Sequence, residues 1–297
     1  PWMTFRDPMG TWSRPWRIFT VTTEYRGADG MKKYFSFFRL RFSMGLQYRA
    51  AALAGIATQA FWGGLEILMF RAFYRADPLA FPMSLESTSA YIWLQQAFLA
   101  LFMGWVMENE IFASIQSGNI VYELCRPIGL YRMLFVRSLA YRLSRAVLRC
   151  FPILLMAAFL PSPYGIALPP SPAAGMLFLL GMVLGLFVTV AFTMLIYSLT
   201  FFTISPAGIR MVALSALEIL SGSILPIPFF PKGLQGVLEI LPFAAMQNVP
   251  LRIYSGDISG NEAIRALSLQ AFWLVVLVGT GVILMSRASK KVTLQGG

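Results

Sequence analysis

Residues 150–209 read CFPILLMAAFLPSPYGIALPPSPAAGMLFLLGMVLGLFVTVAFTMLIYSLTFFTISPAGI and hold no charged side chain in 60 consecutive positions. Because the hydrocarbon core of a bilayer takes about 20 residues of helix, this run is long enough for two membrane spans. The proline-rich stretch 161–172 divides it, and such a backbone cannot cross lipid with its polar groups satisfied. We therefore expect spans at 146–160 and 173–202, joined by a turn outside the membrane.

The rest of the chain supplies four more apolar segments of comparable length. They lie at residues 50–74, 88–107, 208–224 and 266–286. The composition agrees with this pattern, since 57% of the residues are hydrophobic, 12% are charged and the mean hydropathy is +0.66. A soluble domain carries about twice that share of charged residues. The sequence therefore predicts an all-α integral membrane protein with six transmembrane helices.

Residues 31–49 have the pattern of an amphipathic helix that lies in the membrane interface. One narrow face is polar and the other is rich in phenylalanine. The polar positions are Ser36, Arg39, Ser43 and Gln47. Residues 1–30 are polar and contain no run long enough to span, so we expect an N-terminal extension followed by a single domain over 31–297.

A second special segment lies between the last two predicted spans. Residues 234–246 are apolar but too short to cross a bilayer, and Pro231 and Pro250 flank them. We expect a re-entrant or surface helix on the outer side. Within the fourth span, Gly181 and Gly185 have the spacing that allows close helix approach.

The distribution of lysine and arginine predicts the orientation of the chain. Fifteen of these residues lie near the span ends on one side and five lie on the other. Both termini and the segment 108–132 are therefore expected to be cytoplasmic. The net charge of +11 is concentrated beside the apolar spans, which favours anionic lipids over nucleic acid as the partner.

The sequence lacks the motifs of an enzyme. It contains no histidine and two cysteines, which excludes the usual zinc sites and histidine-based triads. It also contains no phosphate-binding GxxxxGK[ST] loop and no dinucleotide-binding glycine motif. We expect no cofactor and no metal on this chain, so any ATP and magnesium would be bound by another subunit.

The segment 108–132 is more regular than a simple connection between spans. Acidic and amide residues at 108–110 suit a helix N-terminus, apolar residues recur at helical spacing, and Gly118 ends the pattern. The apolar positions are Ile111, Phe112 and Ile115. A short cytoplasmic helix of this kind fits a groove on a partner protein. The alternative, a helix that packs only on its own spans, stays open.

Two carboxylates lie inside predicted spans, Glu66 and Glu218. Because a charge within the membrane is costly, such residues are functional candidates by default. Arg71 and Arg75 are near enough in sequence to pair with Glu66, so a structural ion pair competes with a role in a substrate pathway. For Glu218 a polar cavity or gate competes with a buried hydrogen bond between helices. Gln59, Gln95 and Gln96 are weaker candidates for the same pathway.

Particular stretches resemble one family. They are RLRFSMGLQYRAA at 39–51, GNIVYELCRPI at 118–128, LPFAAMQNVPLRIYSGDISG at 241–260 and the terminal QGG at 295–297. Together with the order of the predicted elements, they resemble the permease of a type-2 ATP-binding-cassette exporter, in a bacterial branch of uncharacterised transport systems. The resemblance covers residues 31–297.

The resemblance implies a partner and a role for the segment 108–132. In that family a helix between spans 2 and 3 couples the permease to a separate ATPase subunit. The positions implicated here are Glu110, Ile111, Ile115, Gln116 and Gly118, together with Arg126. The resemblance also implies a second permease, either a copy or a relative, a bacterial inner membrane, and export of an amphipathic or hydrophobic compound.

A different class of protein competes with this interpretation. A self-contained ion channel or ion-coupled transporter could use Glu66 and Glu218 directly. Such transporters commonly carry internal repeats. No convincing repeat relates the first three predicted spans to the last three, so the permease is preferred.

Overall fold

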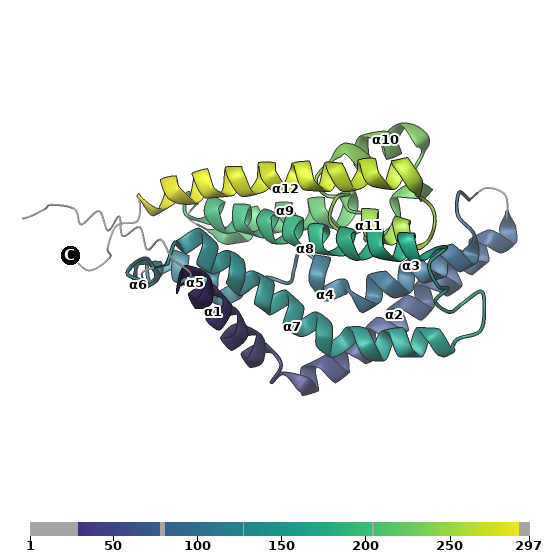
Figure 1. Cartoon of the computed structure of the whole chain (residues 1–297), viewed down its shortest axis with the longest axis horizontal. Coiled ribbons are helices and arrows are strands. Elements are labelled where there is room, and N and C mark those ends of the chain that lie inside the picture. Colours follow the sequence, from purple (N-terminus) through teal and green to yellow (C-terminus); the bar gives the residue numbers. More distant parts are fainter. Residues whose placement is uncertain (1–28, 78–80, 127, 204, 291–297) are drawn as a thin grey trace, which may run out of the picture.

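The computed structural model of the chain describes residues 29–77, 81–126, 128–203 and 205–290. Most of the predicted N-terminal extension and the terminal QGG lie outside these ranges. The regular secondary structure of the described part is all helical, with no strand in these ranges, which confirms the predicted all-α class. The helices form an elongated bundle, with α1, α5 and α6 toward one end and α10 toward the other (Figure 1).

The helices differ widely in length. In chain order they are α1 Asp29–Gly45, α2 Arg49–Ala76, α3 Leu85–Ala97, α4 Leu99–Phe102, α5 Asn109–Gln116, α6 Ile120–Leu124, α7 Leu130–Phe159, α8 Pro172–Thr200, α9 Pro206–Leu220, α10 Lys232–Ile240, α11 Asn248–Tyr254 and α12 Gly260–Ser289, with a short 3-10 helix at Ile227–Phe229. Among these described helices, α2, α8 and α12 are long and apolar enough to cross a membrane. Six spans remain a prediction.

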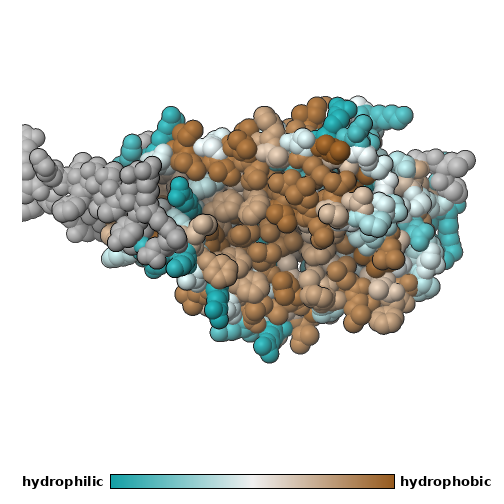
Figure 2. Space-filling model, viewed as in Figure 1, coloured by the Kyte–Doolittle hydropathy of each residue, from teal (hydrophilic) through white to brown (hydrophobic). Residues whose placement is uncertain are grey.

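A broad belt of apolar side chains covers the face seen in Figure 2, and the more polar residues gather toward the two ends. Many of the exposed large apolar side chains of the protein belong to the membrane-length helices, for example Phe61 in α2 and Val275 in α12. Apolar surface on this scale is not tolerated in water. The surface therefore has the layout of a protein embedded in a bilayer.

Helix α8 is the centre of the bundle and packs against α7, α11 and α12. It begins where Ser171 accepts a hydrogen bond from the backbone of Ala174 at 3.1 Å, and Pro172 fits its first turn. A Cβ atom on Gly185 would lie 2.0 Å from the backbone oxygen of Met246. The chain does approach closely at Gly185, but the contact is with the turn before α11 rather than with a helix, which the spacing of Gly181 and Gly185 had suggested.

Gln270 of α12 stabilises the same contact, between α8 and the chain before α11, through hydrogen bonds. Its amide nitrogen donates to the backbone oxygen of Gly181 at 3.2 Å and to that of Ala245 at 2.7 Å. The side chain is fully buried. A buried amide that satisfies two backbone oxygens ties α12, α8 and the chain before α11 into one unit.

The predicted second span, 88–107, is wrong as a continuous helix. The chain forms α3 and the short α4 instead, and residues 103–107 are not helical. The reason is Arg142 of α7, which is 1% exposed and donates to the backbone oxygens of Leu101 at 3.0 Å and Met103 at 2.9 Å. Its guanidinium takes the place of the amides that a continued helix would supply.

Several predicted boundaries also change. The interfacial helix ends at Gly45 rather than at residue 49, because the chain turns at 46–48 to enter α2. The third predicted span lies at the end of α7, which begins far earlier, and α9 stops at Leu220. The segment 234–246 is not one helix, since α10 ends at Ile240 and a turn follows before α11. Pro250 lies inside α11, not beyond it.

Replacing Gly185 with alanine should loosen the contact between α8 and the chain at Met246. The new methyl group would meet a backbone oxygen that cannot rotate away, so we expect a loss of about 1–3 kcal/mol in the free energy of unfolding. Gly175→Ala in the same helix is the matched control, because its nearest contact would be 3.6 Å away. Denaturant titration in mixed micelles measures both variants, and equal stabilities would contradict the assigned contact.

Candidate functional site

A cavity of about 820 Å³ lies beside α2, α3 and the end of α9. One face of α2 forms much of its wall, because residues at helical spacing point the same way. These are Gly55, Thr58, Gln59, Trp62, Leu65, Glu66 and Met69. The opposite walls combine α3, the irregular chain after α4, α7 and α9, through Gln95, Gln96, Leu99, Met103, Trp105, Arg149, Glu218, Ser223 and Ile224.

Three glutamines give the cavity an unusual polar interior. Gln59, Gln95 and Gln96 are 5%, 3% and 5% exposed. Gln95 donates from its amide nitrogen to the backbone oxygen of Ser223 at 2.6 Å, but its own oxygen has no hydrogen-bond partner among the described residues. The oxygen of Gln96 and both polar atoms of Gln59 are also without partners there. Buried polar groups are normally paired, so this cavity offers hydrogen bonds to something else.

Charged groups from three helices reach the same cavity. Glu66 of α2 is half-buried, and one of its carboxylate oxygens has no partner among the described residues. Arg149 of α7 lies close to α2, since a Cβ atom on Gly55 would be 2.6 Å from its guanidinium carbon. Glu218 lines the cavity from α9. The cavity therefore contains two acidic groups and one basic group.

The structure brings together the residues that the sequence proposes for a pathway, including Gln96. Glu66, Glu218, Gln59 and Gln95 line one cavity, although residues 66 and 218 are far apart in the chain. No ion pair joins Glu66 to Arg71 or Arg75 within the described ranges, and the guanidinium of Arg71 lies over the Tyr164 ring instead, 5.1 Å from its centroid. Arg71 is five residues from Glu66 in the sequence, which places its side chain on another face of α2.

Sequence reasoning missed other lining residues. Arg149, Trp62 and Trp105 line the cavity but are not among the residues that the sequence predicts for this site. The helical spacing of Gly55, Gln59, Trp62 and Glu66 could have identified the α2 face. Trp105 could not be found in this way, because the chain at that position is irregular.

The second candidate site is the segment after α4, which forms α5 and α6. Gly118 has a φ angle of 75°, which favours glycine and ends α5 as the sequence predicts. Glu108 immediately precedes α5, but its side chain makes no capping hydrogen bond. A helix therefore begins at 108–110, as the sequence predicts, but Glu108 does not cap it with its side chain, because Arg137 of α7 binds that carboxylate.

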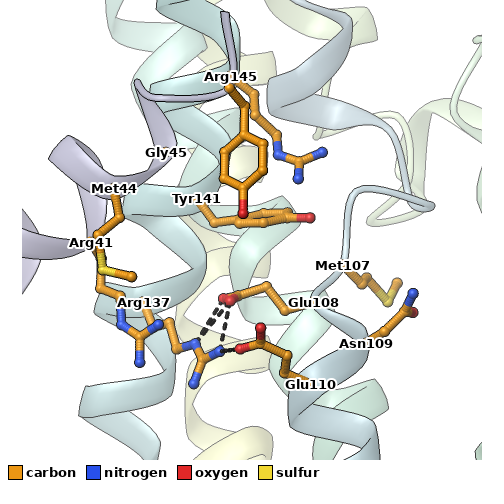
Figure 3. A pocket seen from close by; sticks show the side chains of 11 residues that line it. Arg41, Met44, Gly45, Met107, Glu108, Asn109, Glu110, Arg137, Tyr141 and Arg145 are labelled. Carbon is orange, nitrogen blue, oxygen red and sulfur yellow. Dashed lines mark hydrogen bonds and ion pairs between the residues drawn. The ribbon is translucent and has the colours of Figure 1, made fainter. Parts of the chain in front are cut away.

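Arg137 fixes the start of α5 (Figure 3). Its guanidinium donates to both carboxylate oxygens of Glu108, at 2.8–3.0 Å, and to Glu110 at 2.7 Å. The side chains of Arg137 and Glu108 are 9% and 10% exposed, whereas that of Glu110 is 81% exposed. The backbone amide of Glu108 also donates to the Tyr197 hydroxyl of α8 at 3.0 Å. Two long helices therefore hold this end of α5.

Helix α9 holds α5 from a third direction. Arg210 donates to the side-chain oxygen of Asn109 at 2.7 Å, and its guanidinium lies over the Phe112 ring, 5.5 Å from the centroid. Because α9 also carries Glu218, one rigid element joins α5 to the cavity.

The residues implicated in contact with an ATPase do not share one environment. Ile111 is 1% exposed and packs in the core of this chain, and Ile115 packs partly against the same cluster. Glu110, Gln116 and Arg126 are exposed, and Gly118 is partly buried. Arg126 pairs with Glu123 at 2.9 Å. The outward face is formed instead by Ala113, Gln116, Ser117, Tyr122 and Leu124.

A smaller pocket of about 310 Å³ separates α1 from the start of α5. Arg41 and Met44 of α1 face Glu108 and Glu110 across it, and Arg137 and Tyr141 of α7 line it (Figure 3). Burial and the neighbouring positive charge of Arg137 lower the pKa of Arg41. Close packing holds α1 here, since a Cβ atom on Gly45 would lie 2.1 Å from the Ser144 hydroxyl.

Comparison with known proteins gives one family. The model of a family described as "ABC-2 family transporter protein" matches residues 61–296 of the chain. No curated protein and no solved structure matches it. The matched region contains most of the cavity wall and all of α5 and α6.

Removing Arg137 should destabilise the protein, because Glu108 would keep a buried charge without its partner. For Arg137→Met we expect a loss of about 3 kcal/mol in the free energy of unfolding. The double variant Arg137→Met/Glu108→Gln should recover part of this loss, and Glu110→Gln should cost less than about 1 kcal/mol because that carboxylate is exposed. Denaturant titration compares the variants; a double variant no more stable than Arg137→Met would contradict this assignment.

Proposed function

Because the chain belongs to the ABC-2 family of transporter proteins, we propose that it is the membrane-spanning permease subunit of an ATP-driven exporter that moves an amphipathic or hydrophobic compound. Permeases of this kind work with a separate ATP-binding subunit, and this multi-pass membrane protein has no nucleotide-binding loop in its sequence. The observation that carries the proposal is the cavity, where buried glutamines and carboxylates from three helices converge.

The cavity serves as one part of the transport pathway. Its apolar walls accommodate the hydrophobic part of a compound, and Glu66, Glu218, Gln59 and Gln95 interact with its polar part. Polar groups in a membrane need partners, because lipid tails supply none. Their incomplete pairing within the described residues supports a passage that cargo enters and leaves.

The face of α5 and α6 is the docking surface for the ATPase. Ile111 anchors α5 from inside, and Glu110 belongs to the ion-pair network, so neither supplies the main contact. Gln116, beside Gly118, and the 75% exposed Tyr122 face outward. ATP and magnesium bind to the partner subunit, and this chain contributes no catalytic group.

Transmission from the ATPase to the cavity runs through α9. Arg210 holds Asn109 at the start of α5, and Glu218 is eight residues further on, about 12 Å along the helix. Closure of the ATPases displaces α5, and α9 carries this movement to the cavity wall. The cavity then alternates between access from the two sides, provided that the docked contacts differ between the two states.

The pathway is completed by a second permease, either a copy or a related chain. Exposed apolar residues lie on α2 and α9 beside the cavity, among them Leu65, Met69 and Ile219. A second permease seated on these helices would close the open side of the cavity. We place the assembly in a bacterial inner membrane, with both termini on the cytoplasmic side and anionic lipids beside α1.

The first experiment is an affinity purification of the tagged chain in mild detergent, with the co-eluting chains identified and counted. An ATPase together with a second permease supports a heterodimer of permeases, and an ATPase alone supports a homodimer. A stable chain that elutes without an ATPase would contradict the proposal. It would favour the ion channel or ion-coupled transporter in which Glu66 and Glu218 act without ATP.

Substitution of the outward face should separate docking from folding. For Gln116→Ala/Tyr122→Ala we expect at least a tenfold loss of ATPase association, because both side chains are exposed and would be buried in the complex. Leu168→Ala, which alters an 89% exposed side chain between α7 and α8, is the control. Co-purification and circular dichroism measure association and folding. Full association of the double variant would exclude this face as the docking surface.

A further inference from the structure

The unpaired groups of the cavity are mostly hydrogen-bond acceptors. The amide nitrogen of Gln95 is already used, because it donates to the backbone oxygen of Ser223 at 2.6 Å, and this bond fixes which way the amide is turned. Gln96 is a side-chain hydrogen-bond partner of Glu66. In the described part of the chain, the cavity's side-chain oxygens without partners belong to Gln59, Gln95, Gln96 and Glu66. Two donors are also unpaired there, the amide nitrogen of Gln59 and Nε of Arg149, so acceptors outnumber donors. A ligand at this level of the cavity must therefore supply hydrogen-bond donors.

The charges are separated along the cavity. Arg149 lies against Gly55, and Glu66 is eleven residues further along α2, roughly 16 Å away along the helix axis. Gln96 of α3 lies at the level of Glu66, since it is a hydrogen-bond partner of Glu66 and its Cγ would be 3.1 Å from a Cβ atom on Gly63. This part of the cavity therefore combines the carboxyl group of Glu66 with unpaired acceptor oxygens, a set that a cationic N–H donor can satisfy.

The remaining walls are apolar and aromatic. Trp62 and Trp105 are 56% and 44% exposed, so their rings are open to a ligand. Leu65, Met69 and Leu99 add aliphatic surface. Tryptophan faces attract organic cations, and apolar side chains hold a hydrocarbon body.

We infer that the cargo is a hydrophobic organic cation that carries N–H donors, a lipophilic amine, and that its ammonium group binds between Glu66 of α2 and Gln95 and Gln96 of α3. This inference rests on the proposed function, since it names the class of compound that the same cavity takes. Glu218 supplies a second negative charge at the α9 wall. An anionic compound of the same shape would meet unpaired acceptors and should be rejected.

Three fluorescent probes with one hydrocarbon body test the inference. They are 4-(1-pyrenyl)butylamine, 4-(1-pyrenyl)butanol and 4-(1-pyrenyl)butanoic acid, which differ in the head group alone. The full chain is reconstituted in phosphatidylcholine nanodiscs, and energy transfer from tryptophan to pyrene reports binding near Trp62 and Trp105. Empty nanodiscs give the background of free partition into lipid. We expect saturable binding of the amine at least tenfold tighter than that of the acid, with the alcohol between them.

Substitutions locate the binding group. Glu66→Gln should weaken binding of the amine about tenfold and leave binding of the alcohol unchanged, because it removes a charge and keeps the shape. Glu262→Gln, which neutralises an exposed carboxylate at the start of α12, is the matched control and should change neither. Glu218→Gln is the second variant, to be used if Glu66→Gln does not fold, and should also weaken binding of the amine selectively.

The outcomes distinguish the cargo class from the proposed function. Equal or tighter binding of the acid would overturn the cargo class, and so would identical effects of Glu66→Gln and Glu262→Gln. The permease assignment would stand in either case if the ATPase still co-purifies. No saturable binding of any probe would overturn the cavity as a binding site. Loss of the ATPase from the purified assembly would instead overturn the proposed function.

Discussion

A buried guanidinium that pairs with no carboxylate among the described residues sets the architecture of the bundle. Arg142 of α7 donates to the backbone oxygens of Leu101 and Met103 and to the Thr193 hydroxyl of α8, at 2.9–3.1 Å. A buried charge is costly unless it is hydrogen-bonded, and the end of an interrupted helix provides two of the oxygens that bind this guanidinium, whose Nε has no partner among the described residues. The hydrogen bonds of Arg142 therefore both end the helix after α4 and hold α7 against α8. If α4 continued as a helix, its own amides would occupy these oxygens.

The irregular chain after α4 contributes to both candidate sites, the cavity and the segment that forms α5 and α6. Met103 and Trp105 line the cavity, and a few residues later Glu108 begins the turn into α5. Three helices hold that turn, through Arg137 of α7, Tyr197 of α8 and Arg210 of α9. Most of these contacts are hydrogen bonds and ion pairs, whose strength depends on distance and angle. They can therefore change together when α5 moves. A joint of this kind is suited to passing a displacement from a docked subunit to a cavity wall without deforming the packed core.

The described residues around the cavity do not provide hydrogen-bond partners for all of its polar groups. Its glutamines are nearly inaccessible, yet several of their atoms lack partners within the described residues, and Glu66 retains an unpaired oxygen there. In a membrane such groups are costly, and they persist where they serve a passing compound or a second subunit. Because unpaired acceptors outnumber unpaired donors, the site favours a ligand that donates hydrogen bonds. The tryptophan and aliphatic walls favour a ligand with a hydrophobic body. Burial, charge and hydrogen bonding thus all favour the same class of cargo.

Hydropathy alone predicted the all-α class and the positions of the membrane-length helices α2, α8 and α12. The conformational preference of glycine predicted the end of α5 at Gly118, and the cost of a buried charge made Glu66 and Glu218 candidates. Each of these properties acts locally along the chain. Tertiary structure decided the rest. The break after α4 depends on Arg142, distant in sequence, and the pairing of Glu108 with Arg137 removed its expected capping role. The predicted coupling residue Ile111 turned inward because α5 packs against its own core. The convergence of Gln59, Gln95, Glu66 and Glu218 on one cavity required the packing of α2, α3 and α9, which no local pattern specifies.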